Sequence, residues 1–323
     1  MLLLIAVVLG ALAPQGVSPE ISGVYEVRQY GARGDGQQKD TVAVQAAIDA
    51  AAAHGGGTVH FAPGRYLCGT LHLRSHLTLR IDSGATLLTS REKADLDPYE
   101  ALNYDSHADE ETTDFHLALL AGQNLEDIAI DGHGTLEGNR TERGGPKMIA
   151  LKNCQAVTIR DVTVQNSPNY SVSLLGCEHV NIDGITVRNS YADGIDPDCC
   201  RFVRIANCNV DSHDDAICLK SSLALGTPHP TEFVTITNCV LRTACNYFKM
   251  GTESSGAFRR IALSNCTMSR RTGTRNADRD RGGIAIETVD GAEIDGVVVA
   301  NLTMEDVACP IFLRLGNRGR GQS

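Results

Sequence analysis

The chain has 323 residues, of which 42% are hydrophobic and 21% are charged, and its formal net charge at pH 7 is −10. This composition can bury a hydrophobic core and excludes an intrinsically disordered chain. The acidic surplus argues against binding to the phosphate backbone of nucleic acid, because such binding depends on a basic surface. Length alone does not require two domains. We therefore expect one folded domain without a nucleic-acid partner.

Residues 2–13 form an apolar run that is too short to cross a bilayer and is followed by polar residues. This pattern is typical of a secretory signal peptide. We expect residues 1–18 to be that peptide and residues 19–323 to form a single domain of a secreted or periplasmic protein. A buried N-terminal strand or an anchor helix is the alternative. After cleavage we expect a monomer with no membrane contact.

An alanine-rich stretch follows Asp40 and ends at the glycines 55–57. Val44, Ile48, Ala51 and Ala52 recur on one face at helical spacing. The pattern predicts a helix whose N-cap is Asp40.

From residue 130 onward a short motif recurs, in which Ile or Leu is followed by two polar or small residues. Each copy lies between short strand-like segments without helical period. The copies begin at Ile130, Ile159, Ile182, Ile205, Ile236, Leu263 and Ile294. Strands this short bury their apolar side only by stacking on neighbouring copies. The sequence therefore predicts an all-β fold, a right-handed parallel β-helix whose open N-terminal end is covered by the predicted helix. Because only a polar tail follows residue 313, we expect the solenoid to be truncated at its C-terminus.

The eleven cysteines include no CxxC pair. Cys208, Cys239 and Cys266 each follow a repeat start by two or three residues, so stacking places them in one ladder. Parallel strands lie about 4.8 Å apart, whereas a disulfide requires Cβ atoms about 3.8 Å apart. We therefore expect buried free thiols and no metal site.

Acidic residues recur in two successive coils. Residues 193–198 align with residues 215–220 at an offset of 22, which places Asp193 beside Asp215 and close to Asp214. Three carboxylates about 5 Å apart on the outer face repel one another, and this repulsion raises the pKa of one of them. A proton donor and a base then coexist at one pH, as glycosidic bond cleavage requires. A calcium site and solvated turn aspartates are the alternatives.

The segments YADGID (residues 191–196) and DDAI (residues 214–217) resemble the NTDG and DD motifs of glycoside hydrolase family 28, the polygalacturonases. The likeness extends from residues 30–32 to the end of the chain. It implies a pectin-lyase-like solenoid and inverting hydrolysis of a pectic or related polysaccharide, without a cofactor. It also implies catalytic roles, with Asp214 as the general acid and with Asp193 and Asp215 holding the nucleophilic water.

The sequence departs from the family at two motifs. The family's GHG motif aligns with residues 245–247, where Asn246 replaces the histidine. The Arg-Ile-Lys motif that clamps a uronate carboxylate aligns with Ala285, Ile286 and Glu287, so both cations are absent. The substrate is therefore open among polygalacturonate, a rhamnogalacturonan and another glycan. The two rival functions are β-elimination by a polysaccharide lyase of this fold and carbohydrate binding without turnover.

Six further residues are candidates for substrate binding. They are Lys249, Asn246, His213, Lys220, Asp196 and Tyr170. Lys249 stacks over Cys218, where it either binds an anionic sugar or pairs with Asp196. Lys220 stacks over Asp198 and is expected to pair with it, or to contact substrate.

His213 and Tyr170 each allow two interpretations. His213 either tunes Asp214 or binds sugar, or it lies exposed in a turn. Tyr170 either stacks on a pyranose ring or closes the edge of the core. Finally, the many arginines of residues 259–281 predict a basic loop that attracts an anionic polysaccharide, or merely a solvated one.

Overall fold

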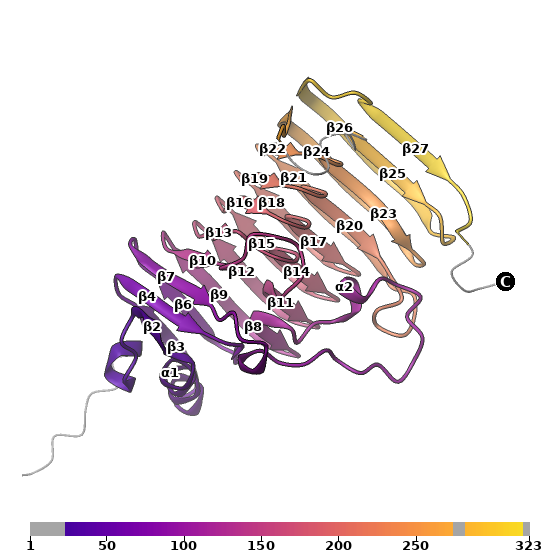
Figure 1. Ribbon diagram of the computed structural model, residues 1–323. Coiled ribbons are helices and arrows are strands. Elements are labelled where there is room, and N and C mark those ends of the chain that lie inside the picture. The colour runs from indigo at the N-terminus through magenta and orange to yellow at the C-terminus, as the bar shows by residue number, and fades with distance from the viewer. Residues whose placement is uncertain (1–22, 274–281, 319–323) are drawn as a thin grey trace, which may run out of the picture.

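The computed structural model describes residues 23–273 and 282–318, which wind into a right-handed parallel β-helix (Figure 1). All paired strands are parallel, and successive coils stack along the axis of the solenoid. The strands form three columns, named here the first, second and third column. The predicted fold class is confirmed.

The first column contains eight short strands. They are β1 (Val24–Glu26), β3 (Gly57–Phe61), β6 (Leu77–Ile81), β9 (Glu126–Gly132), β12 (Gln155–Arg160), β15 (Glu178–Asp183), β18 (Arg201–Ala206) and β21 (Pro230–Thr237). The second column contains β2 (Asp35–Lys39), β4 (Gly64–Cys68), β7 (Ala85–Thr89), β10 (Thr135–Glu137), β13 (Thr163–Gln165), β16 (Thr186–Ser190), β19 (Asn209–Ser212) and β22 (Val240–Thr243). Two longer strands, β24 (Ala257–Arg270) and β26 (Glu293–Glu305), continue both columns.

The third column forms a separate sheet and carries the residues of greatest chemical interest. Its strands are β5 (Leu71–His72), β8 (Ala118–Gln123), β11 (Lys147–Lys152), β14 (Val172–Leu175), β17 (Ile195–Asp198), β20 (Ile217–Ser221), β23 (Phe248–Ser254), β25 (Ile284–Thr288) and β27 (Ile311–Leu315). Residues alternate along these strands between the interior and the outer face, as in any β-strand. Ile217 and Leu219 of β20, for example, are in the core, and the residues between and after them face outward.

The repeat starts stack as predicted in six of seven copies. Ile159 pairs with Ile130 and with Ile182, and the ladder continues to Leu263. The seventh assignment is wrong. Ile294 pairs with Phe258, and the true partner of Leu263 is Val299. Strand β26 holds two similar segments, at residues 294–296 and 299–301, and only pairing with β24 distinguishes them.

The interior is filled by these aliphatic columns and by buried thiols. Cys208, Cys239 and Cys266 are each about 1% exposed, and none of the eleven cysteines is in a disulfide. The expectation of buried free thiols is confirmed. Asparagines at the coil corners adopt left-handed backbone conformations and bridge adjacent coils, as Asn238 does by donating to the Oδ1 of Asn207 at 3.3 Å.

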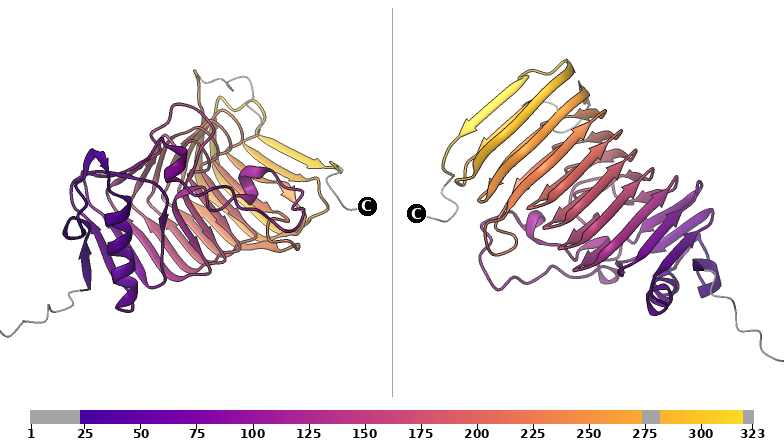
Figure 2. Two further views of the ribbon diagram at one scale, coloured as in Figure 1. Left: turned by 60° about the horizontal axis from the view of Figure 1, so that its bottom comes forward. Right: turned by 180° about the vertical axis from the view of Figure 1, so that it is seen from behind.

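A helix covers the N-terminal end of the solenoid, where it is visible in both views of Figure 2. This helix, α1 (Thr41–Ala53), packs against β1, β3 and the 3-10 helix η1 (Val27–Tyr30). Val44, Ile48 and Ala51 are buried as predicted, although Ala47 takes the place expected for Ala52. Asp40 precedes the helix but does not cap it. Its carboxylate instead accepts from the backbone amides of residues 33 and 34 at 2.6 and 3.0 Å.

Residues 90–117 connect β7 with β8 and run along the third column (Figure 1). They include the short helices η2 (Lys93–Asp95) and α2 (Glu110–Thr113). The Tyr104 hydroxyl donates to the carbonyl of Ala224 at 2.6 Å, and Lys152 pairs with Glu100 at 2.9 Å. Phe115 packs with outward residues of the column in a second small apolar cluster. This segment therefore lies over the outer face of the third column.

Two predictions concern the arginine-rich segment and the N-terminal signal peptide. The predicted basic loop is wrong for residues 259–270, because they belong to β24, in which Arg259 pairs with Glu293 and Arg260 with Glu232. Residues 274–281 and the predicted signal peptide, residues 1–18, lie outside the described residues. Within residues 23–273 and 282–318, no helix is long and apolar enough to cross a membrane.

Candidate active site

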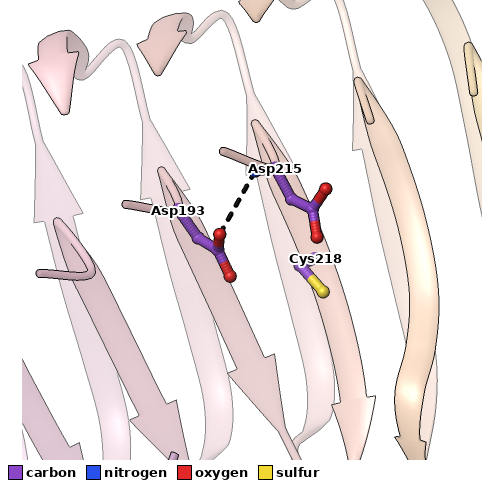
Figure 3. Close-up of side chains that lie close together, drawn as sticks. All are labelled: Asp193, Asp215 and Cys218. Atoms are coloured by element: carbon purple, nitrogen blue, oxygen red, sulfur yellow. Dashed lines mark hydrogen bonds between the residues drawn. The ribbon is translucent and has the colours of Figure 1, made fainter. Parts of the chain in front are cut away.

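Three carboxylates and one amide occupy equivalent places in three neighbouring coils. Asp193 precedes β17, Asp214 and Asp215 precede β20, and Asn246 precedes β23. Ile217 pairs with Ile195 and with Phe248, so Asp215 lies beside Asp193, as the offset of 22 predicts, and Asn246 follows in the next coil. The backbone amide of Asp215 donates to Asp193 Oδ1 at 3.2 Å (Figure 3). Parallel stacking thus places the predicted carboxylates side by side.

Asp193 is buried together with a second carboxylate, Asp196. Lys220 lies between them, with its Nζ 2.7 Å from Asp196 Oδ1 and 3.3 Å from Asp193 Oδ2. Burial and the neighbouring Asp196 raise the pKa of Asp193 well above its ordinary value, although Lys220 opposes them. The expected pairing of Lys220 with Asp198 is wrong. The backbones of these residues pair, but Asp198 accepts from Ser222, and the long lysine side chain reaches the two other carboxylates.

Asp215 is equally buried but has the opposite electrostatic environment. Lys249 donates to its Oδ2 at 2.9 Å, and the side chain and backbone amide of Asn246 donate to its Oδ1 at 2.6 and 3.1 Å. Burial alone would raise the pKa of Asp215, but the charge and hydrogen bond of Lys249 and the bond from Asn246 outweigh it and lower the pKa. The expected partner of Lys249, Asp196, is therefore not the one that it contacts.

Asn246 occupies the place of the histidine in the family motif and hydrogen-bonds a residue in the coil on each side. Besides donating to Asp215, its Oδ1 accepts from the amide of Gly282 at 3.0 Å. The side chain is 2% exposed. An amide can satisfy this pair of contacts without a titrating group, so Asn246 orients Asp215 at every pH.

Asp214 is the most accessible member of the cluster, with 21% of its side chain exposed. Its Oδ2 lies 2.5 Å from Arg143 Nη1, and its Oδ1 accepts from the amide of Asp215 at 3.1 Å. Arg143, in the loop between β10 and β11, also forms two hydrogen bonds to Glu111 of α2, one of them at 2.9 Å. Sequence reasoning missed Arg143 and Glu111, because both lie in loops outside the repeating strands and carry no coil register.

Tyr170 is 5% exposed and lies next to two lysines. Lys220 Nζ lies 3.9 Å and Lys147 Nζ 5.5 Å from the centroid of its ring. The ring therefore packs against lysines that adjoin the carboxylates. His213 hydrogen-bonds the Oδ1 of Asn189 at 2.9 Å, and burial followed by the charge of Arg271 lowers its pKa to about 4. The imidazole is neutral at pH 7.

Lys147 is a second residue that sequence reasoning missed. It is 1% exposed, its Nζ lies 4.1 Å from the ring centroid of Phe115, and it donates to the carbonyl of Asp114 at 2.5 Å. Burial lowers its pKa to about 7, against the attraction of Asp114. Only the folded connection of residues 90–117 creates this environment, so no local sequence signal indicates it.

A calcium site is the alternative interpretation of this cluster. Asp193, Asp215 and Cys218 can place three ligand atoms within 4.8 Å of one another (Figure 3). However, Lys220 and Lys249 already contact these carboxylates, and a thiol is not a ligand for a hard cation. The residues present are better suited to proton transfer than to calcium.

Residues 103–315 match the sequence profile of the family described as glycosyl hydrolases family 28. The chain belongs to this family. It is 28% identical over 316 residues to a "probable polygalacturonase" from Vitis vinifera, an alignment that covers 90% of this chain and 62% of that protein. This chain thus spans less than two thirds of that relative's length.

Two solved structures share the fold of this family member. The family 28 exopolygalacturonase of Yersinia enterocolitica superposes with a TM-score of 0.74 at 19% identity, covering 90% of this chain and 60% of the other. The exopolygalacturonase of Thermotoga maritima superposes with a TM-score of 0.67 at 19% identity, covering 85% and 75%. At this identity the likeness concerns the fold.

Proposed function

We propose that this family 28 protein is a secreted glycoside hydrolase that cleaves a pectic or related acidic polysaccharide with inversion of configuration. The observation that carries the proposal is the stacking of three carboxyl groups in adjacent coils, in which Asp215 is paired with Lys249 while Asp214 is accessible to solvent. The pKa of Asp193 is raised and that of Asp215 is lowered, although a hydrogen bond joins the two residues. Acid and base catalysis of glycoside hydrolysis requires one carboxylate that stays ionised beside a carboxyl group that can donate a proton, and Lys249 and Asn246 keep Asp215 ionised.

The family's roles apply to these residues as follows. Asp214, the accessible member, donates a proton to the leaving oxygen. Asp193 and Asp215 hold the water that attacks the anomeric carbon from the opposite face. Lys249 and Asn246 keep Asp215 ionised and oriented, and Lys220 orients Asp193 and Asp196. The ring of Tyr170 packs against the ammonium group of Lys220. His213 remains a candidate for a neutral contact with sugar.

The comparisons support the substrate class. The Vitis vinifera relative is described as a probable polygalacturonase, and both solved neighbours as exopolygalacturonases. The proposed reaction uses carboxyl groups and water, so it needs no cofactor. We further propose that the protein acts as a monomer outside the cytoplasm after removal of residues 1–18.

The test measures reducing-sugar release from polygalacturonate, rhamnogalacturonan and neutral glycans. We expect release from an acidic substrate and a loss of at least about 100-fold in Asp214→Asn. Asp183→Asn is the matched control, because the Asp183 side chain bonds Asn207 at a coil corner and is not part of the carboxylate cluster. It should retain full activity.

Three results would contradict the proposal. Unaltered release by the Asp214→Asn variant would remove the catalytic assignment. An unsaturated product that absorbs in the ultraviolet would identify a lyase. Binding of a glycan by the folded protein without any turnover would favour the carbohydrate-binding alternative.

A further inference from the structure

Arg143 connects the carboxylate cluster with the segment that lies over it. Its guanidinium group bonds Asp214 on one side and Glu111 of α2 on the other. Of its side chain, 41% is exposed. An exposed guanidinium group that is already in contact with a carboxylate has the geometry to exchange that partner for another carboxylate.

The other cations of the cluster are less accessible. In the described part of the chain, three cations contact Asp193, Asp196, Asp214 or Asp215, and they are Arg143, Lys220 and Lys249. The side chain of Lys220 is 4% exposed and that of Lys249 is 15% exposed. Both contact buried carboxylates that would be left unpaired if the lysine turned toward a ligand, which is costly. Arg143 can turn without such a cost, because Asp214 is open to water.

The neighbouring coil offers no cation at the positions where the family motif has two. Lys249 pairs across the sheet with Ala285, and the next outward residue of β25 is Glu287, an acid. An anionic substrate therefore needs a positive partner from elsewhere on this face. Arg143 reaches the cluster from the opposite side, through the loop between β10 and β11.

We propose that Arg143 binds the carboxylate of a uronate unit of the substrate and leaves Asp214 when it does so. This inference rests on the proposed function and names its recognition element. The exchange replaces one ion pair by another and leaves the Asp214 carboxylate accessible to solvent. Asp214, released from the cation, is then free to act on the leaving oxygen.

The exchange links recognition to catalysis. While Arg143 contacts Asp214, the carboxylate is occupied by the guanidinium group and is not free to reach the leaving oxygen. A uronate carboxylate competes for the guanidinium group, whereas a neutral sugar or a methyl ester does not. An acidic substrate thus frees Asp214 at the moment it binds. Glu111 keeps its contact with Arg143 and limits how far the side chain moves.

The experiment compares trigalacturonate with its methyl ester in wild type, Arg143→Gln and Arg143→Lys. We expect Arg143→Gln to raise KM for trigalacturonate on the order of 10–100-fold and to change KM for the methyl ester by less than about two-fold. Turnover of the ester should stay constant or rise, because Asp214 is free. Arg143→Lys should recover only part of the affinity, since lysine cannot form the paired contacts. Arg188→Gln, which removes an exposed charge of β16, is the matched control.

Equal losses on acid and ester would overturn the inference, because they would indicate a merely structural role. Unchanged KM for both substrates would also overturn it. Equilibrium binding of trigalacturonate keeps the two proposals separate. If the protein binds trigalacturonate through Arg143 but never turns it over, the inference stands and the proposed hydrolase fails. If it turns the substrate over with no effect of Arg143→Gln, the hydrolase stands and the inference fails.

Discussion

Lys249 Nζ lies 2.9 Å from Asp215 Oδ2, and this ion pair joins two adjacent coils on the outer face of the third column. Asp215 is 2% exposed, so the lysine is the principal positive charge available to a buried carboxylate. Together with Asn246 it keeps the pKa of Asp215 below the ordinary value despite burial. The contact therefore sets both the stability and the protonation state of this carboxylate.

Lys249→Met should raise the pKa of Asp215 by about one unit or more, because an opposite charge is removed. We expect the acidic limb of the pH profile of kcat/KM to move upward by the same amount. Lys249→Arg, which keeps the charge, should move it less. If the acidic limb is identical in Lys249→Met and wild type, the ionisation of Asp215 does not control activity.

The same ion pair should stabilise the fold in a pH-dependent way. A lowered pKa means that the stabilisation is present above the unfolded value of 3.8 and is lost as the pH falls through the folded value. Lys249→Met should therefore lower the free energy of unfolding by about 3 kcal/mol at pH 7. Urea denaturation should show a smaller difference at pH 3. An equal difference at both values would contradict the assignment.

Lys147 should destabilise the fold at low and neutral pH. Its pKa of about 7 is below the unfolded value of 10.5, so the unfolded chain binds more protons between these values and stability rises with pH there. Lys147→Met retains the apolar stem between Phe115 and Tyr170 but has no proton to lose. The unfolding free energy of the variant minus that of wild type should be constant below about pH 7 and decline toward pH 9. A difference in unfolding free energy that does not depend on pH would show that folding does not lower the pKa of Lys147.

The thiols should differ sharply in reactivity. Ten cysteines are buried and Cys309 is half-buried. Burial raises the pKa of buried thiols such as Cys68 and Cys218 well above the ordinary value of a cysteine. The thiolate is the reactive form, so buried thiols react slowly. Titration with a chromogenic disulfide reagent at pH 8 should detect one fast thiol, which Cys309→Ser removes. The remaining ten should react only after unfolding in denaturant. Several fast thiols in the native protein would contradict the burial of these ten cysteines.

Asn207 should stabilise a coil corner by two means. Its φ is 59°, and its side chain donates to Asp183 at 2.7 Å while accepting from Asn238. An alanine at this position loses both bonds and adopts a left-handed conformation that costs about 1–2 kcal/mol. We expect Asn207→Ala to lower the unfolding free energy by about 2 kcal/mol. Asn207→Gly should recover the conformational part, and equal losses in both variants would assign the effect to the hydrogen bonds alone.

Coil periodicity accounts for what could be predicted of the fold. In a parallel solenoid the spacing of equivalent apolar residues determines which strands pair. The offset of 22 therefore correctly placed Asp215 beside Asp193, and Asn246 lies in the following coil. The same reasoning failed at Ile294. Two similar segments within β26 compete for one register, and their pairing depends on the whole length of β24.

Side-chain partners were harder to predict than backbone positions. Register correctly placed Lys220 over Asp198, yet the ammonium group contacts Asp196 and Asp193. A lysine side chain spans several residues of a neighbouring strand, so its ion pair is chosen by burial and charge. Arg143 and Glu111 were not predicted at all, because they belong to loops that interrupt the repeat.

The sequence by itself determined the stacking of coils and the gathering of Asp193, Asp214 and Asp215, because both follow from spacing along the chain. Only the tertiary structure decided which cation each carboxylate contacts. That choice depends on the long connection of residues 90–117 and on lysine side chains that cross between coils. The protonation states of the cluster follow from these contacts, and no spacing in the sequence encodes them.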